Sequence, residues 1–118
     1  LLASSAASDV YKRQALRRLK RAKGYMNAGK ESAFFEELLR ALWGYMGDKL
    51  AIDVANLTKE RVLSELVEGR GVPEEQAREF LSLISECEFA QYSPAAGVQM
   101  DKAYNAALDL IGRFESKI

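Results

Sequence analysis

Acidic side chains that stand side by side along the chain are the first residues that could do chemistry. Two adjacent pairs occur, Glu36/Glu37 and Glu74/Glu75, together with one near pair, Glu86/Glu88. Paired carboxylates can serve as general acid and base when both reach one substrate. In a helix, however, neighbouring residues point about 100° apart. We therefore interpret the pairs as solvated helix faces, or as anions that favour a helix N-terminus.

The single cysteine, Cys87, is the other reactive side chain, and the chain contains no histidine. A catalytic thiol needs a neighbour that lowers its pKa, and histidine is both the usual activator and the commonest metal ligand. Cys87 instead falls on an apolar stripe, which is typical of a buried small hydrophobe. The segment Gly69-Arg70-Gly71 lacks the other glycines of a phosphate-binding loop. The sequence predicts no catalytic residue, metal or cofactor.

The elements that must position these residues are helices. Apolar residues recur every three or four positions, which predicts an all-α fold, an irregular bundle of about five amphipathic helices. The expected ranges are 15–28, 31–50, 58–68, a helix starting at Pro73, and 101–114. The 31–50 helix is apolar on several sides, so we expect it to be central. Its expected solvent-facing residues are Glu36, Glu37, Arg40, Gly44 and Asp48.

Smaller signals refine this picture. The expected inner stripe of the first helix is Leu16, Leu19, Ala22 and Met26. Thr58 is expected to cap the third helix, and residues 93–97 should form a late loop. The spacing of Tyr25, Gly29, Leu38 and Ala41 resembles that of one tetratricopeptide helical hairpin.

Charge is distributed unevenly although the chain has a net charge of zero. Five cations crowd the start of the predicted domain: Arg17, Arg18, Lys20, Arg21 and Lys23. From Gly24 onward, ten cations face sixteen anions, a balance of −6. The basic stretch fits a solvated helix face, a segment near an anionic membrane surface, or a nucleic-acid contact. Nucleic acid is the least favoured partner, because the cations lack interleaved aromatics and the acidic body would repel phosphate.

Four aromatic residues are candidates for contact with a partner, because some of them lie near predicted helix ends where a groove could form: Trp43, Tyr45, Phe89 and Tyr92. Glu88 lies beside Phe89 and joins this set. Exposed aromatics often anchor protein interfaces, but large aromatics also fill cores. Both interpretations of Trp43 stay open at this level.

The first fourteen residues have no helical apolar period. Residues 9–14 read DVYKRQ, which is one translation of GATGTGTATAAGAGACAG, the end of a common sequencing-library transposon. We therefore expect residues 1–14 to be an adapter-derived or disordered lead, and 15–118 to form a single helical domain. No apolar run approaches the roughly 18 residues of a membrane span.

Several phrases of the sequence resemble the C-terminal cytosolic region of BatD-type proteins from bacterial aerotolerance operons. These phrases are RRLKRAKGYM, ESAFFEELLRALWGYMGDKL, AIDVANLTKERVLSEL, GRGVPEEQ and ECEFAQYSP. The family often carries Arg at the position of Gln91, so this chain departs from it there.

The resemblance implies a transmembrane helix upstream, with this domain on the cytoplasmic face of the bacterial inner membrane and residues 15–23 next to the bilayer. It also implies that the partners are von Willebrand factor A-domain membrane proteins and a MoxR-type ATPase. The function expected from the sequence is a non-catalytic protein-interaction module. The alternatives are a soluble tetratricopeptide-like adaptor and, less favoured, a small nucleic-acid-binding domain.

Overall fold

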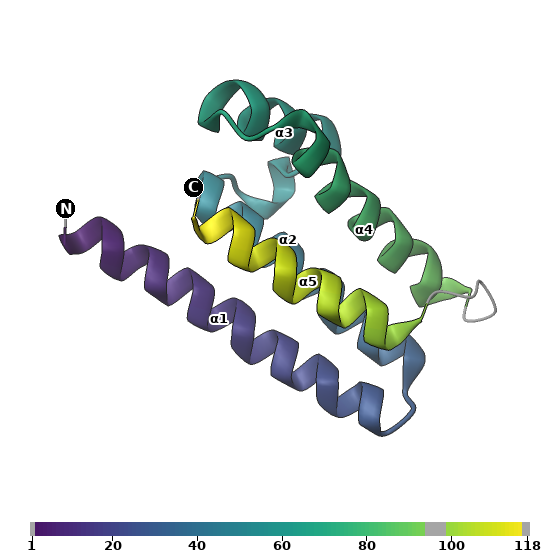
Figure 1. The fold of residues 1–118 in the computed structure, drawn as a ribbon. Coiled ribbons are helices and arrows are strands. Elements are labelled where there is room, and N and C mark those ends of the chain that lie inside the picture. The colour runs from purple at the N-terminus through teal and green to yellow at the C-terminus, as the bar shows by residue number, and fades with distance from the viewer. Residues whose placement is uncertain (1, 94–98, 117–118) are drawn as a thin grey trace.

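The computed structural model describes residues 2–93 and 99–116, with side chains from Val10 onward, and shows helices joined by short turns (Figure 1). Over these residues no β-strand occurs, so the predicted all-α bundle is confirmed. The α-helices are α1 (Leu2–Asn27), α2 (Glu31–Leu50), α3 (Lys59–Ser64), α4 (Glu74–Tyr92) and α5 (Met100–Glu115). A 3₁₀ turn, η1 (Val54–Asn56), precedes α3, and a π-helical turn, η2 (Glu65–Gly69), follows it.

The central element is α2, as its broad apolar face predicts. It contacts α1, α4 and α5, and in Figure 1 it lies behind α5, between α1 and α4. Both of its apolar rows are inside: Phe34, Leu38, Ala41 and Tyr45 from one, and Phe35, Leu42, Met46 and Leu50 from the other. Burying each large side chain stabilises the fold by roughly 1.5–3 kcal/mol. The packing of α2 therefore holds the other helices together.

The first helix starts earlier than the sequence predicts. α1 runs from Leu2 without a break at Ala15, because residues 2–15 contain no glycine or proline to interrupt it. Its buried face is Ala15, Leu19 and Ala22, whereas Leu16 is 37% exposed. The expected stripe was thus wrong at its first position, because Ala15, and not Leu16, shares a face with Leu19 and Ala22. A three-residue turn then reverses the chain, and α1 and α2 form a helical hairpin (Figure 1).

Each helix of this hairpin is followed by a residue in the left-handed backbone conformation. Gly29 (φ 71°) follows α1, and Ala51 (φ 55°) follows α2. In each turn the next amide donates back into the helix, Lys30 N to Tyr25 O and Ile52 N to Gly47 O, both at 2.9 Å. These bonds satisfy carbonyls that the helix end would otherwise leave unpaired. The turn at Ala51 sets the direction in which the chain leaves α2 toward η1.

The second half of the chain packs over α2. Thr58 caps α3 as predicted, since its Oγ1 accepts a hydrogen bond from Arg61 N at 3.1 Å. Pro73 immediately precedes α4, so this helix begins at Glu74, one residue after the predicted start at Pro73. The sequence pattern of α4 places Leu81 on its inner face, but Leu81 is only half-buried and Leu83 is buried instead. Most of the predicted 93–97 loop lies outside the described residues.

Within the described part of the chain, no helix combines the length and apolar character needed to cross a bilayer.

Candidate functional site

Tyr45, expected to contact a partner, belongs instead to a polar cluster inside the bundle. Its side chain is 1% exposed, and its hydroxyl donates a hydrogen bond to Glu115 on α5. Lys49 Nζ lies 2.9 Å from Oε2 of the same carboxylate. Burial first, then the hydrogen bond and charge of Glu115, raise the pKa of the Tyr45 phenol far above its ordinary value. Tyr45 therefore ties α2 to the end of α5 and is not a surface residue.

The adjacent carboxylates of α2 have structural roles. Glu36 is exposed and its Oε1 lies 2.9 Å from Arg40 Nη2. Glu37 was expected in solvent but is 4% exposed, because its side of α2 faces α1. Its carboxylate lies 3.4 Å from Arg40 Nη1 and 3.8 Å from Arg21 Nη1. A buried carboxylate needs such partners, so Glu37 joins one arginine from each helix.

Cys87 is fully buried on α4, as its apolar stripe predicts. Burial first, then the charges of Glu86 and Glu88, raises the pKa of the thiol to about 12. A thiol in this environment stays protonated at neutral pH and is a poor nucleophile. Among the described residues, no group of histidine, cysteine and acidic side chains is arranged to hold a metal ion.

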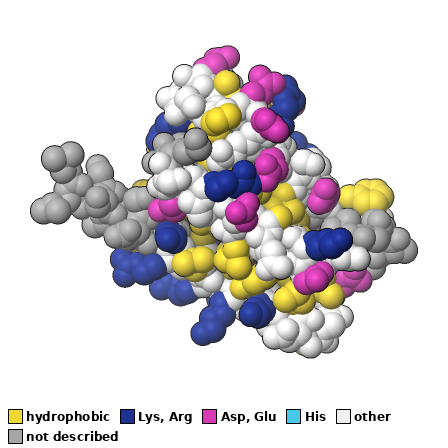
Figure 2. Space-filling model, viewed as in Figure 1, with side chains coloured by type: hydrophobic (Ala, Val, Ile, Leu, Met, Phe, Trp, Pro, Cys, Tyr) yellow, Lys and Arg dark blue, Asp and Glu magenta, His cyan; other side chains and the backbone are white. Residues whose placement is uncertain are grey.

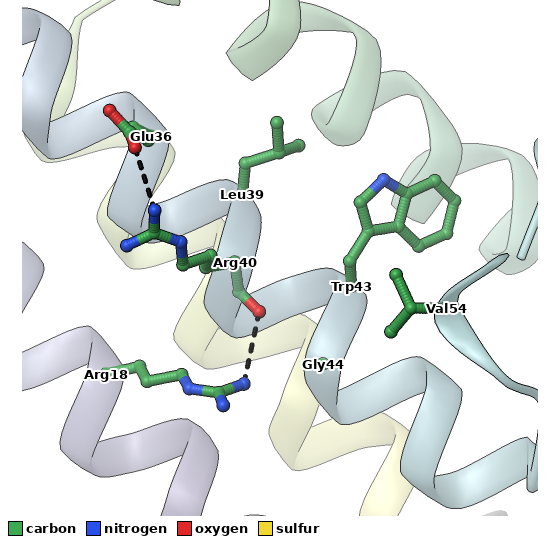
Figure 3. A pocket seen from close by; sticks show the side chains of 7 residues that line it. All are labelled: Arg18, Glu36, Leu39, Arg40, Trp43, Gly44 and Val54. Atoms are coloured by element: carbon green, nitrogen blue, oxygen red, sulfur yellow. Dashed lines mark hydrogen bonds and ion pairs between the residues drawn. The ribbon is translucent and has the colours of Figure 1, made fainter.

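One hollow lies between α1, α2 and η1, and we call it the Trp43 groove (Figure 3). Its volume is about 320 Å³, and its lining residues are Arg18, Glu36, Leu39, Arg40, Trp43, Gly44 and Val54. Trp43 and Leu39 are half-buried, and Val54 is 78% exposed. Figure 3 shows the indole of Trp43 beside Val54, with the two arginines at the other end of the hollow. The groove thus has an apolar end and a cationic end.

Arg18 reaches this groove from α1 by lying across the backbone of α2. Its Nη1 donates a hydrogen bond to the carbonyl oxygen of Arg40 at 3.4 Å (Figure 3). The guanidinium occupies the space next to Gly44 that a Cβ would fill. A glycine at this point of the helix therefore allows Arg18 to pass between the helices.

A second hollow, the arginine patch, adjoins the groove through Arg18. It is lined by Gln14, Arg17, Arg18 and Arg21 and has a volume of about 300 Å³. Dark blue side chains gather along the lower edge of Figure 2, where Figure 1 places α1, while magenta ones gather over α3 and α4. The predicted basic stretch thus forms a cationic face. Within it, Lys20 is exposed, and Lys23 Nζ lies 5.7 Å from the ring centroid of Tyr104.

The remaining predicted partner-binding residues share another surface, which we call the aromatic patch. Phe89 and Tyr92 are 61% and 82% exposed, and with Lys59, Ser85, Glu88 and Ser93 they line a hollow of about 430 Å³. Lys59 Nζ lies 2.7 Å from Glu88 Oε1, which neutralises both charges. The structure therefore brings Glu88, Phe89 and Tyr92 together. They line a different hollow from the one lined by Trp43.

Comparison of the chain with protein-family models, with curated proteins and with solved structures gives no match. Evidence on function therefore comes from the fold, the Trp43 groove, the arginine patch and the aromatic patch. Sequence patterns drew attention to Trp43 and Arg18 separately, but gave no reason to associate them with Val54, which lies in a connection. The sequence signal that could have found it was an apolar valine in the connection between two predicted helices.

Proposed function

We propose that this chain is a non-catalytic protein-interaction module that holds a segment of a partner protein in the Trp43 groove. The observation that carries the proposal is the placement of half-buried Trp43 beside strongly exposed Val54, with Arg18 and Arg40 at the other end. Interfaces are typically anchored by aromatic and arginine side chains in a concave, apolar centre. Tyr45 and Cys87 have strongly raised pKa values, and perturbed pKa values are common at catalytic sites. Neither residue lines the groove or the arginine patch.

In its more specific form, we propose that the module is the cytosolic tail of a BatD-like membrane-anchored protein. Its partners would then be von Willebrand factor A-domain proteins and a MoxR-type ATPase. The sequence phrases support this assignment, and a cationic stretch at the start of the domain is typical of the cytoplasmic side of a transmembrane helix. Sequencing the DNA upstream of residue 15 in its source tests the anchor, because an open reading frame without a transmembrane segment would contradict it.

A matched pair of surface variants tests the binding role of the groove. Val54→Glu places a charge in the groove, whereas Leu108→Glu makes the same kind of change on α5, where Leu108 is 37% exposed and lines neither hollow. Binding to the purified ATPase and A-domain protein encoded beside the gene is measured by calorimetry. We expect Val54→Glu to weaken binding by about tenfold or more and Leu108→Glu to leave it unchanged.

Circular dichroism and the thermal unfolding midpoint show whether both variants remain folded. The proposal is wrong if neither protein binds the unaltered chain, or if the two variants bind equally well.

A further inference from the structure

We infer that the segment held by the Trp43 groove is an acidic peptide in which a large apolar side chain stands next to two or more carboxylates. The inference rests on the proposed function, since it names the chemistry of the partner at the same site. Its basis is the sharing of Arg18 between the Trp43 groove and the arginine patch. A single ligand can therefore contact an apolar hollow and a cationic hollow at once.

The apolar end of the groove has the size and rigidity for one anchor residue. The whole groove has a volume of about 320 Å³, near the lower limit of small-ligand pockets, about 300 Å³, so its apolar end suits a side chain better than a large cofactor. The indole of Trp43 packs edge-on against Phe80, with ring centroids 6.1 Å apart. That contact holds the indole in position before a partner arrives, which reduces the entropy lost on binding.

The cationic end has positive charge to spare. Both nearby anions, Glu36 and Glu37, already bond to Arg40. Arg21 adds only a 3.8 Å contact to Glu37, and Arg18 donates to a neutral carbonyl oxygen. Over the described residues Arg17 makes no ion pair, so this corner of the molecule carries an excess of cations. Carboxylates are the protein groups that match arginine best, because a guanidinium can bond both oxygens.

The charge of the whole chain favours a peptide here over a broad anionic surface. From Gly24 onward the balance is −6, so phosphates spread over a membrane or a duplex would meet repulsion beyond α1. A flat lipid surface would also leave the groove between Trp43 and Val54 empty. A short peptide contacts only the cationic corner and fills the groove. Arg17 and Arg21 are one helical turn apart, about 6 Å along α1, so the carboxylates need to lie within a few residues of the anchor.

The test uses four fluorescein-labelled synthetic octapeptides and the full chain. The first contains Leu-Phe followed by three acidic residues. The second replaces the acids with glutamines, the third replaces Leu-Phe with two serines, and the fourth replaces the acids with lysines. Fluorescence anisotropy measures each affinity, with vesicles of phosphatidylglycerol and a DNA duplex as competing ligands. We expect the first peptide to bind at least about tenfold more tightly than each of the others.

Charge variants connect this selectivity to the site. Arg17→Glu with Arg18→Glu should abolish the preference for the acidic peptide, whereas Arg61→Glu on α3, which lines neither hollow, should preserve it. Binding should weaken as sodium chloride is raised from about 0.05 M to about 0.3 M, because screening reduces the attraction. Val54→Glu should weaken the binding of both the first peptide and the glutamine peptide, because both carry the apolar anchor.

Three results overturn the inference. They are equal binding of all four peptides, a preference for the lysine peptide, and displacement of the acidic peptide by vesicles or duplex at lower concentrations than unlabelled peptide requires. If the peptides fail while the intact partner proteins still distinguish Val54→Glu from Leu108→Glu, only the acidic chemistry is wrong. If both experiments fail, the proposed function is wrong as well.

Discussion

The guanidinium of Arg18 lies against the backbone of Gly44, in the space that the side chain of any other residue would need. These two residues come from different helices, α1 and α2. A Cβ at position 44 would overlap Arg18 Nη1 and lie 3.4 Å from its Cζ. Because the overlapping group is the far end of a flexible side chain, it can move without unfolding the helix. The glycine therefore sets the position of Arg18 more than it sets the stability of α2.

The substitution Gly44→Ala should separate stability from binding. Alanine favours a helix interior by roughly 0.5–1 kcal/mol over glycine, so the free energy of unfolding should stay the same or rise slightly. Arg18 must leave its place, so binding of the acidic peptide should weaken several-fold. Gly112→Ala on α5 is the matched control, since nothing lies within 4 Å of its added Cβ. Urea unfolding and anisotropy measure the two effects, and equal binding by both variants would show that the position of Arg18 does not matter.

The contact between these two residues also shows what the sequence could predict. Helix α2 was predicted with its observed bounds, because Gly29 and a broad apolar face are local signals. Arg18 was predicted only as one of several cations. Its position depends on Gly44, which lies 26 residues later in the sequence and on a different helix, α2. Glu37 was placed in solvent for a similar reason. Its burial comes from the packing of α1, which also supplies Arg21, and a single-helix pattern contains no information about a partner on another helix.

The hydroxyl of Tyr45 should contribute measurably to stability. It donates to Glu115, which also bonds Lys49, so Tyr45→Phe leaves a partly buried carboxylate with one donor fewer. Hydrogen bonds to charged groups are worth about 1.5–3 kcal/mol. Tyr104→Phe makes the same chemical change at a half-buried ring for which the described residues show no hydroxyl hydrogen bond. We expect a lower free energy of unfolding for the first variant only, measured in urea by circular dichroism. An equal loss of free energy of unfolding in both variants would mean that the hydrogen bond from Tyr45 to Glu115 does not stabilise the fold.

Cys87 should make the protein less stable at alkaline pH. The thiol has an ordinary pKa of 9.0 and a folded pKa of about 12, so the unfolded chain loses its proton first as pH rises. The stabilisation is complete below pH 9 and declines between pH 9 and about 12, by up to about 1.4 kcal/mol per pH unit.

Cys87→Ala lacks this titration, although removing the buried sulfur lowers its stability at neutral pH. The difference in free energy of unfolding between the native chain and the variant should therefore shrink as pH rises above 9. Unfolding in urea at a series of pH values measures it. Iodoacetamide should alkylate the native chain only as fast as it unfolds, and rapid alkylation of the folded protein at neutral pH would contradict the burial of the thiol.

The two left-handed turns that end α1 and α2 predict opposite effects for opposite substitutions. Both positions have the same hydrogen bonds, but Gly29 suits a positive φ and Ala51 does not. Ala51→Gly should raise the free energy of unfolding by up to about 1 kcal/mol, because it removes backbone strain. Gly29→Ala should lower it by a similar amount, since its Cβ meets nothing within 4 Å and only the strain changes. Thermal and urea unfolding of both variants measure the effects, and a change of the same sign in both would show that the left-handed conformation does not limit stability at these turns.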